Sequence, residues 1–247
     1  MRALRILLIF VMILGVLFVV VDRVAVRLAE GQAADRLKAT ENLASTPDVS
    51  IKGFPYLTQL ASGELDDVEV GIKDYEVATG NGARKIRIDD LSADMRGVRF
   101  SGDYGSATAA TATGTATIAY DQLLKAAKSD SAQVAPGVTA HVVGLSDGGD
   151  GKIKVDVEVE ATVLGIKQRR TLSLLSSAAV RGNKVEVRAD NLPMVGGVRL
   201  PEGRVRSITD FQQAIDRLPA GVELDSVRAA ADGVEITLKG SDVKLAG

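Results

Sequence analysis

The chain has 247 residues and a formal net charge of −2, with 46% hydrophobic and 25% charged residues. This balance suits a protein that packs a core, and it excludes wholesale disorder. It also argues against a general nucleic-acid binder, which needs a basic excess to neutralise phosphates. The chain has no Cys, so disulfide bonds, zinc–thiolate sites and thiol nucleophiles are excluded.

The N-terminus opens with an apolar run, residues 6–21, which carries no charge and follows Arg2 and Arg5. The two arginines predict a cytoplasmic N-terminus and an extracytoplasmic remainder. We expect residues 1–26 to form a retained single-pass signal anchor in the cell membrane. A cleaved signal peptide, giving a secreted protein, is the alternative, although the best cleavage motif, Gly31-Gln32-Ala33, is poor. The folded domain is then residues 27–247.

The apolar run is followed by a predicted helix over residues 23–43, which are rich in Ala, Leu, Glu, Arg and Lys. Pro47 ends this helix, because the residue before a proline is pushed out of the helical region. Residues 49–70 then read as two strands with an interruption. Gly53 and Pro55 are expected to stop the first strand and to turn the chain.

Downstream, apolar and polar residues alternate with a period of two, the pattern of antiparallel strands with one buried face. The alternation slips at residues 73–74 and 89–90, where a bulge would keep the apolar set on one face. Several of these strands are longer than usual, which suggests an elongated and curved sheet. The clearest predicted strands are residues 67–77, 85–100, 152–163, 184–192 and 233–240.

Two short helices interrupt the strand pattern, at residues 120–128 and 207–218. In the second, Ser207 and Asp210 have capping-box spacing and Ile208, Phe211, Ile215 and Leu218 form one stripe. We therefore expect one α+β domain, mostly antiparallel. Its long strands present a wide apolar face that the three helices cover only in part. An ordinary core, in which this face packs on itself and on the helices, is the alternative.

Catalytic and metal motifs are weak. "GLSDG" (144–148) fits the nucleophile elbow of α/β-hydrolases, but Ser146 leads into another strand and the only His, His141, precedes it. A hairpin loop and a structural or surface His are the better interpretations. The carboxylates of "GELDDVE" (63–69) lack EF-hand spacing, and side chains on the wet face of a strand explain them. We predict no catalytic residue, metal ligand or cofactor.

Basic residues gather in the later part of the chain. Arg and Lys suit a phosphate headgroup, and a solvated sheet face is the alternative. The residues are Lys167, Arg169, Arg170, Arg181, Lys184, Arg188, Arg199, Arg204 and Arg206.

The segment "VSIKGFPYLTQLASGELDDVEV" (49–70) resembles the signature of the LmeA-like family of bacterial envelope proteins. The resemblance extends to the apolar N-terminus, the Ala/Arg-rich helix, "DNLP" (190–193), "ITDFQQAI" (208–215) and "LPAGVELDSV" (218–227). It implies phospholipid binding in the cell envelope, a link to lipomannan maturation, and a tubular lipid-binding fold. In that fold a curved antiparallel sheet wraps a long helix and leaves an apolar channel for acyl chains.

From this resemblance and from the wide apolar face we predict a non-enzymatic protein whose partners are phospholipid or glycolipid and the cytoplasmic membrane. A structural or interaction domain that assists envelope glycolipid enzymes is the alternative, and an enzyme with unrecognised carboxylates is a third reading. The aromatic segment would lie at the mouth of the lipid site, or would plug one end of the core. The predicted lipid-binding residues are Phe54, Pro55, Tyr56, Leu57 and Leu60.

Overall fold

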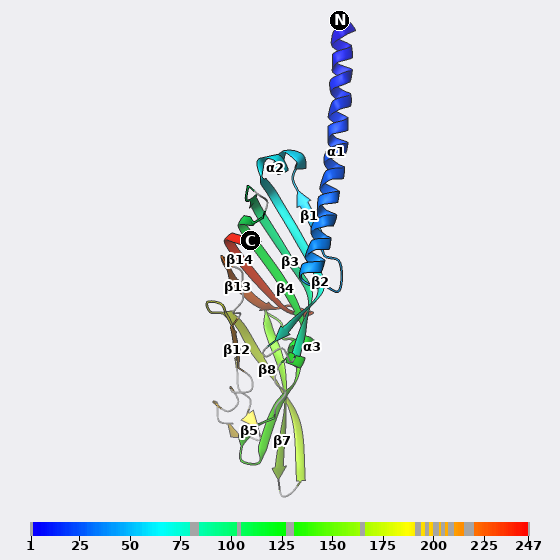
Figure 1. Cartoon of the computed structure of the whole chain (residues 1–247). Coiled ribbons are helices and arrows are strands. Elements are labelled where there is room, and N and C mark those ends of the chain that lie inside the picture. Colours follow the sequence, from blue (N-terminus) through cyan, green and yellow to red (C-terminus); the bar gives the residue numbers. More distant parts are fainter. Residues whose placement is uncertain are drawn as a thin grey trace.

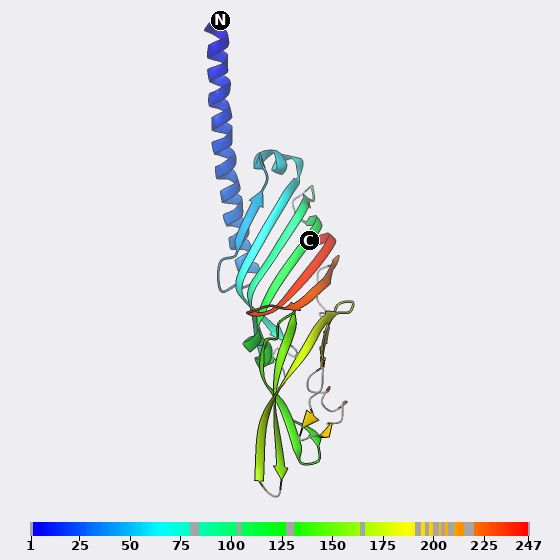
Figure 2. The same cartoon turned by 180° about the vertical axis from the view of Figure 1, so that it is seen from behind.

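The computed structural model shows an elongated molecule in which one long helix and two antiparallel sheets follow one another along the long axis (Figure 1). Seen from behind, the N-terminus of the helix and the far hairpin of the second sheet again lie at opposite ends (Figure 2). The structure describes residues 2–79, 84–102, 105–126, 131–163, 166–190, 194–195, 198–199, 203, 206, 210–214 and 220–246.

Helix α1 (Arg2–Thr40) is continuous from the apolar run into the helix predicted at residues 23–43. Residues 6–21 are exposed on every side, and α1 is long and apolar enough to cross a membrane. Its second half lies beside the first sheet, so the predicted helix at 23–43 is confirmed and ends three residues early. Two short helices with described bounds are α2 (Tyr56–Ser62) and α3 (Tyr120–Ala126).

The first sheet lies next to α1 and has the strand order β1-β2-β3-β4-β14-β13. Every neighbouring pair in it is antiparallel. The C-terminal strand β14 thus returns to pair with β4, and the chain between β4 and β13 contains the strands of the second sheet. The bounds are β1 (Asp48–Lys52), β2 (Glu64–Thr79), β3 (Arg84–Phe100), β4 (Ala107–Ala119), β13 (Val222–Ala229) and β14 (Gly233–Ala246).

The second sheet forms the end of the molecule away from α1 and has the order β12-β9-β8-β7-β6-β5 (Figure 1). A separate short pair is formed by β10 (Met194–Val195) and β11 (Val198–Arg199). The bounds of the second sheet are β5 (Ala132–Ala135), β6 (Val138–Asp147), β7 (Lys152–Val163), β8 (Ile166–Val180), β9 (Lys184–Ala189) and β12 (Phe211–Ala214).

The predicted slips in alternation occur where the structure breaks its pairing. Between β2 and β3, the pairing skips Asp74 and Asp89 together, and Asp74 has a φ of 53°. The register is therefore the same on both sides, because each strand is irregular at the same level. The predicted irregularity is confirmed, but it is a matched interruption of both strands and not one extra residue in one strand.

A second interruption crosses four strands of the first sheet at one level. The pairing skips Asp66 on β2, Gly97 on β3, Ala110 on β4 and Asp242 on β14. Gly97 and Asp242 have φ values of 59° and 50°, and a Cβ on Gly97 would lie only 3.0 Å from the Cβ of Ala110. Aligned irregularities of this kind bend a sheet, so this line gives the sheet its curvature near α2.

The helix predicted at residues 207–218 is wrong within the described residues. Residues Phe211–Ala214 form strand β12 and pair with β9 from Lys184 to Val187. Asp210 does not cap a helix; its carboxylate accepts the Ala189 N–H at 3.1 Å and pairs with Arg206 at 3.2 Å. Helix propensity lost here because the edge of β9 offers unpaired backbone groups to this segment. Residues 207–209 and 215–219 lie outside the described residues.

Two hydrophobic clusters hold the described parts together. One joins the second half of α1, α2 and the near end of the first sheet, and includes Val26, Tyr56 and Val98. The other joins α3, the second sheet and the far ends of β13 and β14, and includes Val157 and Val227. The first sheet is therefore packed at both of its ends by different clusters.

Candidate functional site: an apolar sheet face beside the helix

The two faces of the first sheet are cleanly separated by polarity. Residues that lie directly opposite each other on neighbouring strands project on the same face. Three consecutive rows across β2, β3, β4 and β14 contain only apolar residues and glycine, and we call these twelve residues the open apolar face: Val68, Met95, Ala112, Gly240; Val70, Ala93, Gly114, Leu238; Ile72, Leu91, Ala116, Ile236.

The rows between them are polar and face the other way. Glu69, Asp94, Thr113 and Lys239 make one such row. Strand β4 shows the contrast most simply from Ala112 to Thr117, where Ala and Gly residues lie on the apolar face and Thr residues lie on the polar one. A one-residue change of register would exchange the faces, so this alternation fixes which side of the sheet is apolar.

Small residues on β4 make the open apolar face lowest along its middle. Ala112, Gly114 and Ala116 carry no atom beyond Cβ, whereas β3 and β14 flank them with larger residues such as Leu91 and Leu238. At the α2 end of the strand the line continues to Ala109, which is 0% exposed beneath the cluster of α1 and α2. Ala116 is 7% exposed at the other end, so the open part from Ala112 to Ala116 runs roughly 13 Å at 3.3 Å per residue. The hydrocarbon of one bilayer leaflet has about the same length.

The middle of this face is only partly covered by protein. Val70, Ala93, Gly114 and Leu238 form its central row, are partly exposed, and belong to neither hydrophobic cluster among the described residues. A folded protein normally covers such side chains, since each fully buried aliphatic group is worth about 1.5–3 kcal/mol. An apolar row left open between two packed clusters is therefore a candidate site for an apolar ligand.

Two carboxylates of α1 fix the helix beside this face. Asp22 is 0% exposed, and its Oδ1 accepts the Leu57 N–H of α2 at 2.9 Å. Glu30 accepts the Ile51 N–H of the edge strand β1 at 2.8 Å. Each carboxylate satisfies a backbone donor that has no partner within its own element. The helix, α2 and β1 are thereby held as one unit.

The aromatic segment between β1 and α2 divides between surface and core. Phe54 is 54% exposed, and the Arg23 guanidinium lies 4.9 Å from the centre of its ring. Tyr56 is 6% exposed and packs in the α1–α2 cluster, where burial raises the pKa of its hydroxyl. Leu57 and Leu60 are partly buried against the same cluster. The five predicted residues are thus brought together at one end of the first sheet, beside the point where the apolar run of α1 ends.

The turn that carries this segment depends on Gly53. Its φ is 95°, and an added Cβ would clash with the side-chain amide of Gln59 and lie 2.8 Å from Asp66 Oδ2. Gln59 is itself buried and accepts the Asp66 N–H at 2.8 Å, which ties α2 to the start of β2. Without a Cβ, Gly53 can lie close against Gln59 of α2 where β1 ends. Helix α2 begins at Tyr56, directly after Pro55. The prediction that Gly53 and Pro55 stop the strand and turn the chain is confirmed; the helix that follows was not predicted.

Replacing each of the two aromatic residues separately distinguishes their roles. Phe54→Asp is expected to change the free energy of unfolding by no more than about 0.5 kcal/mol, because its ring is exposed. Tyr56→Ala is expected to cost about 3 kcal/mol through loss of buried ring contacts. Urea unfolding of the full chain in detergent measures both. Equal and large losses for both variants would mean that Phe54 also belongs to the core.

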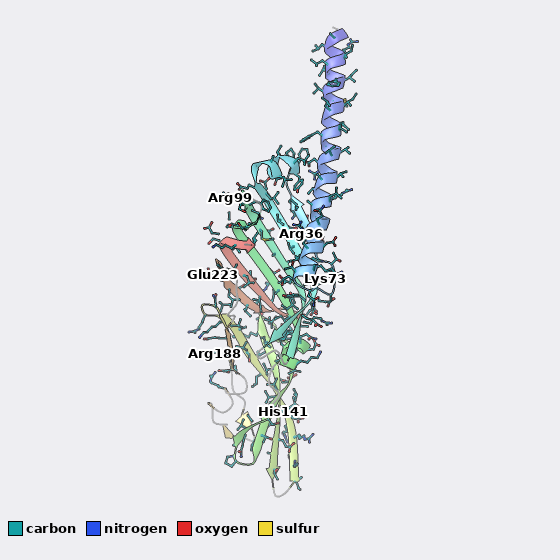
Figure 3. All side chains as sticks on the ribbon, in the orientation of Figure 1. Arg36, Lys73, Arg99, His141, Arg188 and Glu223 are labelled. Carbon is teal, nitrogen blue, oxygen red and sulfur yellow. The ribbon has the colours of Figure 1, made fainter. Side chains whose placement is uncertain are left out.

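A polar depression lies at the α2 end of the first sheet. It has a volume of about 290 Å³ and is lined by residues 61–64 and 99–102. Arg99 Nε lies 3.2 Å from Glu64 Oε2 at its rim. Figure 3 shows Arg99 at the end of the sheet that bears α2, far from His141. Arg99 lies opposite Thr108, so it projects on the polar face at the end of the sheet where the apolar line on β4 starts.

The weaker sequence candidates lie elsewhere. Ser146 is on β6, followed by a turn into β7, as the hairpin interpretation predicted. His141 lies 3.7 Å from Glu158 on the second sheet. Three carboxylates on the polar face of the first sheet converge within 4.8 Å, but each faces a cation, Lys52 or Arg96; they are Asp67, Glu69 and Asp94.

Most of the described basic residues in the later part of the chain form ion pairs on the surface. Lys167 and Arg169 pair with Glu160, whose carboxyl pKa these partners lower. Arg181 and Arg188 share Glu186. These pairs are typical of a solvated sheet face, and they lie on the second sheet, away from the open apolar face.

Sequence reasoning missed the floor of the site. A wide apolar face was predicted, but no strand was predicted for Ala107–Ala119, which form β4. The sequence of β4, "ATAATATGTATIA", alternates Ala with Thr. That period of two was available as a signal, although Ala is a weak strand former. Which apolar face remains open could not be read from any single strand, because it depends on where α1 and α2 lie.

Comparison with known proteins agrees with the geometry. Residues 20–239 match the LmeA-like phospholipid-binding family, which covers the second half of α1 and nearly all of both sheets. A search of the curated proteins found no match, and neither did a search of the solved structures. With nearly its whole length matched, this chain belongs to the LmeA-like phospholipid-binding family.

Proposed function

We propose that this protein is anchored in the cytoplasmic membrane by α1 and holds a phospholipid or glycolipid on its extracytoplasmic side, without covalent chemistry. The observation that carries the proposal is the open apolar face, with its low line of Ala and Gly along β4. An acyl chain on this line would gain about 0.8 kcal/mol for each CH₂ group that leaves water.

The α2 end of the sheet is the proposed mouth of the lipid site. Phe54, Leu57 and Leu60 lie there with Arg23, at the level where the apolar run of α1 stops. An exposed aromatic under a cation suits the boundary between hydrocarbon and headgroups. A lipid could pass from this boundary onto the apolar face along β4, with its headgroup held at this end of the sheet near Arg23.

Retention of the N-terminal segment, as opposed to cleavage, is supported by the packing of α1. Cleavage at Gly31-Gln32-Ala33 would remove Asp22, Val26 and Glu30, all of which contact the domain. The arginines before the apolar run support an extracytoplasmic domain. A role in maintaining envelope lipids or lipoglycans follows from family membership as our proposal.

Site-specific photocrosslinking tests the lipid site. The full chain is expressed in bacterial membranes with a benzophenone amino acid at Leu238, which is already a large residue on the apolar face, or at its neighbour Lys239, on the polar face. Irradiation is expected to attach phospholipid at position 238 and not at position 239, as read by the mass of the purified chain.

The comparison of these adjacent positions controls for expression and for general contact with the bilayer. Equal adducts at both positions, or none at 238, would contradict the lipid site. Adducts at 238 that are proteins, with lipid absent, would favour the alternative of an interaction domain that assists envelope enzymes.

A further inference from the structure

The hairpin of β7 and β8 forms the end of the molecule farthest from the start of α1 (Figures 1 and 2). Residues 166–171 of β8 are all exposed, although successive residues point to opposite faces of a strand. Neither face of this part of the hairpin is therefore covered by the described residues. It projects beyond the core of the second sheet, whose buried residues on β7 end at Val159.

The projecting tip is both apolar and basic. Ile166 is 64% exposed and pairs with Val163, and the sequence joins these two residues through Leu and Gly. Lys167, Arg169 and Arg170 follow within four residues. The other hairpin turns expected from the sequence, such as 146–151 and 181–183, are polar instead. A large apolar side chain such as Ile166, left exposed beside a cluster of cations, is unusual for a surface that only contacts water.

The positive charge of the tip is not cancelled by its surroundings. Within the described part of the chain, Glu160 is the carboxylate that pairs with the tip, through Lys167 and Arg169. Glu158 lies one step farther from the tip, opposite Thr171, and faces His141. Arg170 lies opposite Val159 and has no ion pair among the described residues. The neighbouring strands β5 and β6 add none, because the sequence from 131 to 140 contains no Asp or Glu. Three cations against one anion leave an excess of two positive charges, in a chain whose net charge is −2.

We infer that this hairpin tip docks on an anionic lipid surface, in a second bilayer that faces the one crossed by α1. Exposed apolar residues that enter the interface, followed by cations at the headgroup level, are the chemistry that binds anionic membranes. The second bilayer follows from position: Asp22 and Glu30 fix α1 to the first sheet, so the tip points away from the first membrane. This last step rests on the proposed anchoring by α1.

Vesicle capture tests the inference with the full chain. Proteoliposomes of phosphatidylcholine that carry the chain are mixed with dye-labelled protein-free vesicles and floated. Vesicles of equimolar phosphatidylglycerol and phosphatidylcholine are expected to be captured, and vesicles of phosphatidylcholine alone are not. Replacing Lys167, Arg169 and Arg170 with Glu should reduce capture about tenfold or more, and Ile166→Asp should reduce it as well.

The matched control replaces Lys73, Lys184 and Lys244 with Glu, which gives the same change in net charge at exposed positions away from the tip. It should capture vesicles like the unchanged chain. So should Ala112→Phe, which separates failure of tip docking from failure of the lipid site. Equal capture of neutral vesicles, no capture of either kind, or an equal loss in the control would overturn the inference. If a crosslinker at position 166 captures only protein in cells, the tip is a protein-binding surface instead.

Discussion

Ala112→Phe is expected to remove bound phospholipid from the protein while leaving the protein folded. The new ring would stand on the low line of β4, between Met95 on β3 and Gly240 on β14, where an acyl chain is proposed to lie. Ala112 is partly exposed at the border between the α1–α2 cluster and the open central row, so the ring can extend over that row without filling a closed core.

The measurement is the amount of phospholipid that co-purifies with the full chain in a mild detergent, by mass spectrometry of an organic extract. We expect a loss of about tenfold, which corresponds to about 1.4 kcal/mol. Thr113→Phe is the control, because the same ring then stands on the polar face. Lipid content that is the same in both variants would place the lipid away from this face.

Asp22→Ala is expected to release α2 from α1. The carboxylate is completely buried and accepts the Leu57 N–H, so its loss leaves a backbone donor without a partner. An unpaired buried donor costs about 1–3 kcal/mol. Tyr56 packs in the cluster of α1 and α2, so its packing should loosen when α2 is released.

Hydrogen exchange of the full chain measures this effect at α2. Residues 56–62 should exchange faster in Asp22→Ala, while β7 in the second sheet should not change. Asp22→Asn keeps an acceptor oxygen and removes only the charge, so it should retain most of the protection. If both variants exchange like the unchanged chain, Asp22 does not hold α2. If Asn is as damaging as Ala, the charge beside Arg23 matters more than the hydrogen bond.

These two variants test different parts of one arrangement. Ala112 belongs to the surface on which lipid is proposed to lie, whereas Asp22 positions the helix and the aromatic segment at its mouth. Loss of lipid in Asp22→Ala together with faster exchange would show that the mouth must be held in place for lipid to remain bound. Faster exchange with normal lipid content would confine the role of Asp22 to stability.

The sequence by itself determined the local features of this protein. The uncharged run at residues 6–21 predicted a helix apolar and long enough to serve as a membrane anchor or signal segment. Strict alternation predicted strands such as β7, because side chains of a strand alternate between two faces. Gly53 and Pro55 predicted the end of β1, since backbone restrictions at these residue types are local. The signature at 49–70 predicted the family that the comparison shows.

Tertiary structure decided what these features do. Phe54 and Tyr56 are both aromatic and lie two residues apart. Packing against α1 buries Tyr56, whereas Phe54 stays exposed. The segment Phe211–Ala214 became a strand because β9 offered an edge, which no local preference encodes. The open apolar face exists because α1 and α2 cover one end of the sheet and the α3 cluster covers the other. A gap in coverage depends on contacts between residues distant in sequence, and alternation along a single strand cannot reveal it.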